Sequence, residues 1–100
     1  NDHERKKLMS TITVVFDMPN VTSAQYDEVI RSLDAAGEGN PKGRLYHLAS
    51  PKEEGWLVVD VWESDELLNQ FAQTLIPIMQ EAGLTPPQPQ VYPLHNVISG

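Results

Sequence analysis

The sequence has no cysteine among its 100 residues. This absence excludes disulfide bonds and thiolate chemistry, and it favours a reducing, cytoplasmic setting. Positive charge is also scarce, because 7 Lys and Arg residues stand against 14 Asp and Glu residues and leave a net charge of −7. Nucleic acids and anionic membrane surfaces bind a basic face, so we expect neither as a partner.

Long apolar runs are missing as well. No segment approaches the roughly 20 consecutive apolar residues of a membrane span, and the polar start NDHERKKLMS lacks the apolar region of a signal peptide. Met9-Ser10 resembles a natural initiation site, so residues 1–9 are predicted to be a disordered or added extension before a single domain, residues 10–98. A domain this short leaves much surface uncovered when it folds alone, which favours pairing with a second copy.

Four segments have the composition of strands, and two have the apolar spacing of helices. The expected strands are Ser10–Phe16, Arg44–Ala49, Gly55–Trp62 and Val91–Ile98. With one helix after the first strand and one after the third, the order is βαββαβ, the split arrangement of a ferredoxin-like α+β sandwich. We therefore expect a four-stranded antiparallel sheet with both helices on one face and the other face uncovered.

Both expected helices have start signals. Thr22 has Gln25 three residues later, which is the spacing of a capping box, and Ser64 can cap the second helix. Pro77 cannot donate a backbone hydrogen bond and is predicted to kink or divide that second helix.

The third strand, in the stretch GWLVVDVWES, holds the most informative residues. Because strand side chains alternate between faces, its aliphatic residues are predicted to pack under the helices: Leu57, Val59 and Val61. Its other side chains would share the uncovered face: Trp56, Val58, Asp60 and Trp62. Two indoles on that face predict an interface or a ligand site. We expect a homodimer that packs sheet against sheet around a cavity.

Trp62-Glu63-Ser64, which leads straight into a capped helix, resembles the strand end of the dimeric α+β barrel superfamily, and most of all antibiotic-biosynthesis-monooxygenase-like domains. The resemblance covers residues 10–98. It implies a homodimeric barrel without a cofactor, and it spans cofactor-independent oxygenases of polyketide aromatics or quinols, haem-degrading enzymes and isomerases. Two family signatures are replaced in this sequence. The haem-ligating histidine corresponds to Ala72, and the cavity asparagine of the polyketide oxygenases corresponds to Val58.

Asp60 is the leading candidate for chemistry. A carboxylate in a closed cavity resists ionisation, which suits a general base or acid near neutral pH. Its alternative role is structural, in a pair with Arg44, His47 or His95. His47 would face Asp60 only if the phase of its strand points it to the cavity, and His95 only if the strand order brings the last strand close.

The ligand-binding candidates are Trp62, Val58 and Trp56, whose indoles suit stacking on a flat aromatic molecule. Two histidines and one aspartate on three strands lack the local spacing of metal ligands, so we expect neither metal nor cofactor. Two functions fit these residues. One is a small-molecule binding protein without turnover. The other is a cofactor-independent monooxygenase or isomerase that acts on a quinol or polyketide-type aromatic, with Asp60 as base and His47 or His95 assisting.

Overall fold

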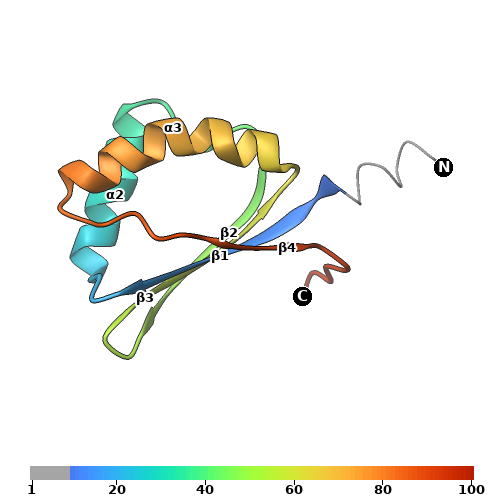
Figure 1. The fold of residues 1–100 in the computed structure, drawn as a ribbon, viewed down its shortest axis with the longest axis horizontal. Coiled ribbons are helices and arrows are strands. Elements are labelled where there is room, and N and C mark those ends of the chain that lie inside the picture. Colours follow the sequence, from blue (N-terminus) through green and yellow to red (C-terminus); the bar gives the residue numbers. More distant parts are fainter. Residues whose placement is uncertain (1–9) are drawn as a thin grey trace.

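The computed structural model describes residues 10–100, so the extension predicted for residues 1–9 lies outside the described part. The elements, in chain order, are β1 (Ile12–Pro19), α2 (Ser23–Ala35), β2 (Arg44–Lys52), β3 (Gly55–Trp62), α3 (Asp65–Glu81) and β4 (Gln90–Pro93). The strands form one antiparallel sheet in the order β2-β3-β1-β4. Both helices cover the same face of this sheet (Figure 1). The predicted ferredoxin-like α+β fold is confirmed.

The two helices begin at the residues that the sequence indicates. The Thr22 hydroxyl accepts a hydrogen bond from the Gln25 backbone N–H at 3.2 Å, and the Gln25 side chain accepts one from the Thr22 N–H at 3.0 Å. This is a complete capping box. At the start of α3, the Ser64 hydroxyl accepts from the Leu67 N–H at 3.2 Å. These caps satisfy donors that an uncapped helix would leave without partners.

Strands β1 and β2 end later than predicted, at Pro19 and Lys52, and α3 and β4 also differ from the prediction. Helix α3 continues through Pro77 without a break. Pro77 is exposed, while Leu68, Phe71 and Met79 are buried on the opposite side and hold the helix on both flanks of the proline. Strand β4 ends at Pro93, well before the predicted limit at Ile98. Beyond Pro93, the sheet gains the hydrogen bond from the Leu94 N–H to the Thr11 carbonyl, and the chain then leaves it.

The two faces of β3 are the reverse of the prediction. The face toward the helices carries residues with exposures of 8, 5, 3 and 0%, in the order Trp56, Val58, Asp60 and Trp62. Strand pairing places them beside inward-facing residues of β1, because Val14 lies opposite Asp60 and Ile12 opposite Trp62. Alternation alone does not tell which face is covered. The large indoles fill the space under the helices, where Trp62 packs on Phe71 of α3.

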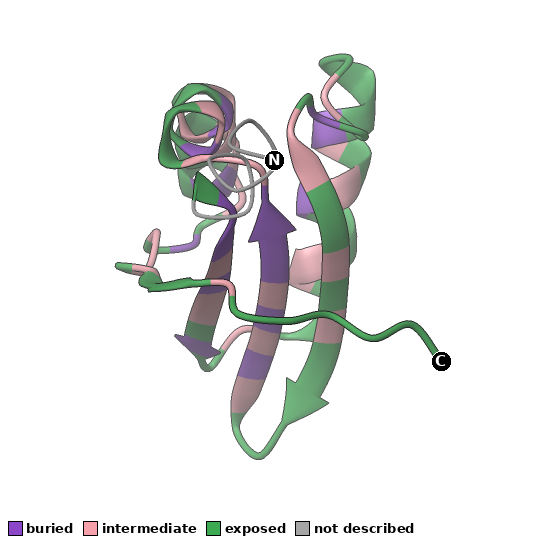
Figure 2. Ribbon diagram, turned by 90° about the vertical axis from the view of Figure 1, so that its right-hand side faces the viewer, coloured by how far each residue is buried: buried purple, intermediate pink, exposed green. Residues whose placement is uncertain are grey.

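The open sheet face is therefore aliphatic and tyrosine-rich, without tryptophan. Leu57 and Val59 lie on it, half-buried. On the neighbouring strands, Tyr46, Leu48 and Tyr92 are 47, 57 and 52% exposed. Figure 2 shows the contrast between the mostly exposed β2 and the buried or intermediate β3. The uncovered face is apolar as predicted, but different residues make it so.

Candidate functional site

Asp60 lies in the middle of β3, between the two strands that flank it. On β2 its cross-strand partner is His47, and the His47 Nδ1 is 2.6 Å from Asp60 Oδ1. The phase of β2 that the sequence left open is therefore the one that turns His47 inward. Both side chains lie under the helices, with exposures of 22% for His47 and 4% for Asp60.

A continuous hydrogen-bonded chain passes through this pair. Tyr26 of α2 stacks parallel to the His47 ring, and its hydroxyl is 2.6 Å from His47 Nε2. At the other end, the Trp62 indole N–H donates to Asp60 Oδ2 at 3.1 Å. We call Tyr26, His47, Asp60 and Trp62 the relay. With Asp60 ionised, His47 donates from Nδ1 to the carboxylate, and Nε2 accepts the Tyr26 hydroxyl proton.

The electrostatics of the relay keep Tyr26 in its neutral form. Burial raises the pKa of the Tyr26 phenol above its usual 10.0, since desolvation disfavours the phenolate. The Arg44 guanidinium acts against this rise, whereas Asp60 and Asp27 add to it. Tyr26 is thus a proton donor toward His47 over the physiological range of pH, and its oxygen lone pairs are left to accept from a ligand.

A cavity of about 60 Å³ lies beside the relay, between the sheet and the helices. Most of its wall is apolar and comes from β1, α2 and α3, with Phe16, Met18, Val29, Leu33, Phe71 and Met79 among the lining residues. The polar part of the wall consists of Tyr26, Arg44, His47 and Asp60. A cavity that accepts benzene has roughly 150 Å³, so a ring-sized ligand requires the two methionines, whose side chains are flexible, to move aside.

Arg44 is a candidate for function that the sequence indicated only as a possible structural partner of Asp60. It starts β2 and lines the cavity. Its guanidinium carbon lies 6.0 Å from the centre of the Phe71 ring, and one of its N–H groups donates to the Gly39 carbonyl at 3.1 Å. Within residues 10–100, no carboxylate forms an ion pair with it. A lone arginine at the start of a strand gives no signal of this position in the sequence.

The ligand-binding candidates divide. Val58 lines the cavity, but neither Trp56 nor Trp62 does. Trp62 is fully buried as a support for Asp60. Trp56 packs on Tyr26, and its buried indole N–H has no hydrogen-bond partner within the described residues. Trp56 therefore contacts the ring of Tyr26, Trp62 holds Asp60, and the stacking of a ligand on either indole stays a prediction.

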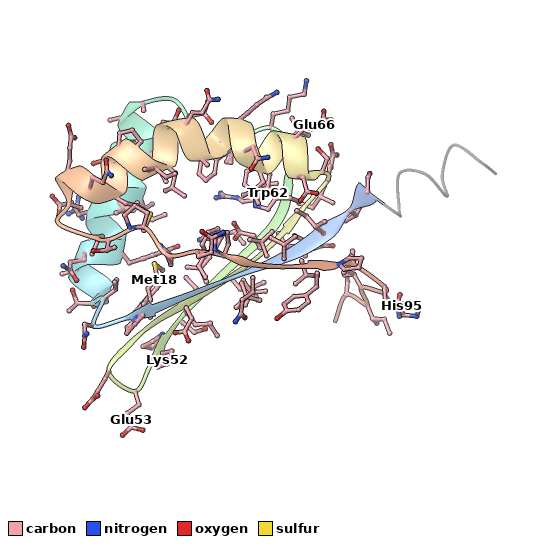
Figure 3. All side chains as sticks on the ribbon, in the orientation of Figure 1. Met18, Lys52, Glu53, Trp62, Glu66 and His95 are labelled. Atoms are coloured by element: carbon pink, nitrogen blue, oxygen red, sulfur yellow. The ribbon has the colours of Figure 1, made fainter. Side chains whose placement is uncertain are left out.

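The catalytic candidates divide as well. Both carboxylate oxygens of Asp60 accept hydrogen bonds, from His47 and Trp62, and Asp60 also lines the cavity. His95 follows the end of β4, is exposed, and points away from the helices (Figure 3). The strand order places β4 at the opposite edge of the sheet from β2, the strand that carries His47. The second hydrogen-bond partner of His47 is Tyr26 of α2, and not His95.

Metal sites and membrane spans are both absent from the described part of the chain. Residues 10–100 contain no group of three His, Asp or Glu side chains placed to hold a metal ion. Within the same range, the helices are too short or too polar to cross a membrane.

Comparison with known proteins gives matches at the level of structure. No protein-family model matches the chain, and no curated protein matches it in sequence. Rv0793 from Mycobacterium tuberculosis is 13% identical with a TM-score of 0.66, over 90% of this chain and 100% of that one. SnoaB, a cofactor-independent oxygenase from Streptomyces nogalater, is 14% identical with a TM-score of 0.63, over 91% of this chain and 99% of that one.

A third similar structure is a Caulobacter crescentus protein with the provisional name antibiotic biosynthesis monooxygenase. It is 17% identical with a TM-score of 0.60, over 96% of this chain and 100% of that one. Identities this low establish the fold alone, and they do so over nearly the whole length of each chain. The protein therefore shares the ferredoxin-like α+β fold of these three structures.

Proposed function

We propose that this protein is a cofactor-independent enzyme that removes a proton from a small apolar aromatic molecule in the cavity, with His47 as the base and Asp60 as the residue that orients it. The observation that carries this proposal is the 2.6 Å contact between His47 Nδ1 and Asp60 Oδ1 beside an apolar cavity. A histidine oriented by a carboxylate is a recurrent general base. The similarity in fold to SnoaB, described as a cofactor-independent oxygenase, supports the same class of reaction.

The proton reaches His47 through Tyr26. The Tyr26 hydroxyl hydrogen-bonds His47 Nε2 at 2.6 Å, so its oxygen accepts the substrate proton while its own proton passes to Nε2. Asp60 then faces an imidazolium, which its negative charge stabilises. Because the two transfers occur together, Tyr26 stays neutral throughout, as its raised pKa requires.

The carbanion that remains has two fates. In an oxygenase, an activated methylene is oxidised by molecular oxygen, R₂CH₂ + O₂ → R₂C=O + H₂O, with one oxygen atom in the product carbonyl and the other in water. In an isomerase, the carbanion regains the proton at another carbon. Oxygen dependence of turnover separates the two.

The test is a screen of anthrone-like and quinol compounds for oxygen uptake, corrected for spontaneous oxidation. His47→Gln and Asp60→Asn are each expected to lower the rate about a hundredfold or more, the usual contribution of a general base. Tyr46→Phe is the matched control, because Tyr46 lies on the open sheet face, and it should keep the parent rate. Saturable binding without turnover would instead identify a binding protein. Turnover that survives both active-site changes would refute His47 as the base.

We further infer that the protein is a homodimer. Its open sheet face carries the exposed side chains of Tyr46, Leu48 and Tyr92, and a contiguous apolar face of this kind usually marks a protein interface. A second copy packed sheet against sheet would cover it. The cavity with the relay lies on the other face of the same sheet, so each subunit would hold its own site.

A further inference from the structure

We propose that Arg44 is an anion-binding residue of the cavity, and that the ligand is a weak acid, a phenol or an enol, that enters neutral and is held beside Arg44 as its anion. The inference rests on the proposed function only in taking the same cavity as the site. It adds a residue and a chemical class of ligand that the His47–Asp60 pair does not specify.

The first support is the missing counter-charge of Arg44. The chain has twice as many acidic as basic residues, yet within residues 10–100 no carboxylate pairs with this guanidinium. Asp60, which lines the same cavity, is bonded to His47 and Trp62 instead. Arg44 is half-buried and lines a mostly apolar wall, so its charge is partly shielded from water and an ion pair there is stronger than in bulk water. A ligand anion would supply the pair.

The second support is the set of hydrogen-bonding groups left available. Arginine has five N–H donors, and one of them is used, on the Gly39 carbonyl. The Tyr26 hydroxyl points its proton at His47 Nε2, which leaves its oxygen to accept. The cavity thus offers an acceptor for a ligand O–H and cationic donors for the oxygen that has lost its proton. A hydrocarbon would use neither.

The third support is the charge of the cavity before and after proton transfer. Its charged and titratable wall residues are Tyr26 on α2, Arg44 and His47 on β2, and Asp60 on β3, whereas β1 and α3 contribute apolar side chains. With a neutral ligand, the positive charge of Arg44 and the negative charge of Asp60 cancel. When the ligand proton reaches His47, one positive and one negative charge appear together, and the balance holds. A carboxylate ligand, which is already ionised, would bring a negative charge into the cavity without a new positive charge on His47 to compensate it.

This class of ligand agrees with the reaction proposed above. An activated methylene and its enol share one conjugate anion, so the anion held by Arg44 is also the species that oxygen would attack. The cavity volume of about 60 Å³ is smaller than the roughly 150 Å³ that accepts benzene. Any ring therefore requires the cavity to widen, and single-ring compounds, which require the least widening, are the first ligands to test.

The experiment is a spectroscopic titration of 4-nitrophenol, whose phenolate is coloured, with the whole protein and without any turnover. Arg44 should lower the pKa of the bound phenol by about one or more relative to the free phenol, a tenfold or greater preference for phenolate. Arg44→Gln should remove that preference. Arg44→Lys should keep part of it, and it provides the measurement if the Gln variant does not fold. The control is Arg31→Gln, an exposed arginine of α2, which should behave like the parent protein.

Nitrobenzene and benzoate complete the test. Nitrobenzene has no acidic proton and should bind the parent and the Arg44→Gln variant equally. The proposal is overturned if the bound phenol ionises alike in both proteins, if benzoate binds tighter than the phenol in an Arg44-dependent way, or if no single-ring phenol binds saturably. Phenolate preference, with neither oxygen uptake nor isomerisation of any compound in the screen, would uphold the Arg44 site and refute the enzymatic function. Turnover without an Arg44-dependent phenolate preference would uphold the enzymatic function and refute the Arg44 site.

Discussion

At the scale of single residues, Asp60 explains why a carboxylate is tolerated in a core strand. It is 3% exposed, and an unpaired charge at that depth would be strongly destabilising. Its two oxygens instead accept hydrogen bonds from a cross-strand neighbour, His47, and from Trp62 two positions along its own strand. Asp60 also lines the cavity. Its negative charge would stabilise a positive charge on His47.

Tyr26 makes the stability of the protein depend on pH in the alkaline range. Its folded pKa lies above 10.0, chiefly because burial disfavours the phenolate, whereas in the unfolded chain it titrates near its usual value. As pH rises through about 10, the unfolded state loses this proton first, so the free energy of unfolding falls until pH passes the folded pKa. Below about pH 9 the contribution of this group is complete.

We therefore expect Tyr26→Phe to show a smaller loss of stability between about pH 8 and about pH 10.5 than the parent protein, as measured by urea unfolding. The variant also loses the hydrogen bond to His47, at a cost of about 1 kcal/mol, but that cost is present at neutral pH and leaves the slope unchanged. Equal slopes for the parent and Tyr26→Phe would contradict the raised pKa.

At the scale of elements, the sequence predicts β3 accurately in its limits and in its alternation, but it does not show which face is covered. The error follows from judging the aliphatic face to be the core. The volume and the polarity of the β3 side chains together decide which face the helices cover. Phe71 of α3 packs on Trp62, and Tyr26 of α2 hydrogen-bonds His47 of the relay. Both partners come from elements distant in sequence. The His47–Asp60 pair was foreseen as one of two strand phases, and only the register of β2 and β3 selects it.

The junction between β2 and α3 depends on Gly43. Its φ of +93° lies in the region that favours glycine, and a Cβ there would approach the Leu67 Cβ of α3 to 2.8 Å. The Gly43 carbonyl also accepts a hydrogen bond from the Glu63 N–H at 2.8 Å. Close packing at this point sets the position of Arg44, the next residue along the chain, over Phe71.

We expect Gly43→Ala to lower the free energy of unfolding by about 2 to 4 kcal/mol, the sum of backbone strain and overpacking. Gly37→Ala is the matched control. Gly37 has a similar φ of +79°, but an added Cβ would meet no atom within 4 Å, so only the strain of about 1 to 2 kcal/mol applies. Urea unfolding of the two variants gives the difference. Equal losses would mean that Leu67 moves aside freely and that the junction does not fix Arg44.

At the scale of the whole molecule, the two faces of the sheet have separate tasks. The covered face contains the relay and the cavity, and the open face contains Tyr46, Leu48 and Tyr92. The sequence predicted a dimer from tryptophans that turn out to be buried in the subunit core. The argument for a second copy survives because other large apolar side chains occupy the open face. A charge placed there should therefore separate the subunits without disturbing the cavity.

Leu48 is the residue to change, because it is 57% exposed on the open face, in the middle of the edge strand β2 and opposite Val59 on β3. Leu48→Glu would bury a carboxylate in the interface of a protein that already has a net charge of −7, and such burial costs several kcal/mol without a partner. Sedimentation velocity at micromolar concentration should give a dimer for the parent and a monomer for Leu48→Glu. Ile76→Glu, on the exposed side of α3, should remain dimeric. A parent protein that sediments as a monomer, or a Leu48→Glu variant as dimeric as the control, would show that this face is not the subunit interface.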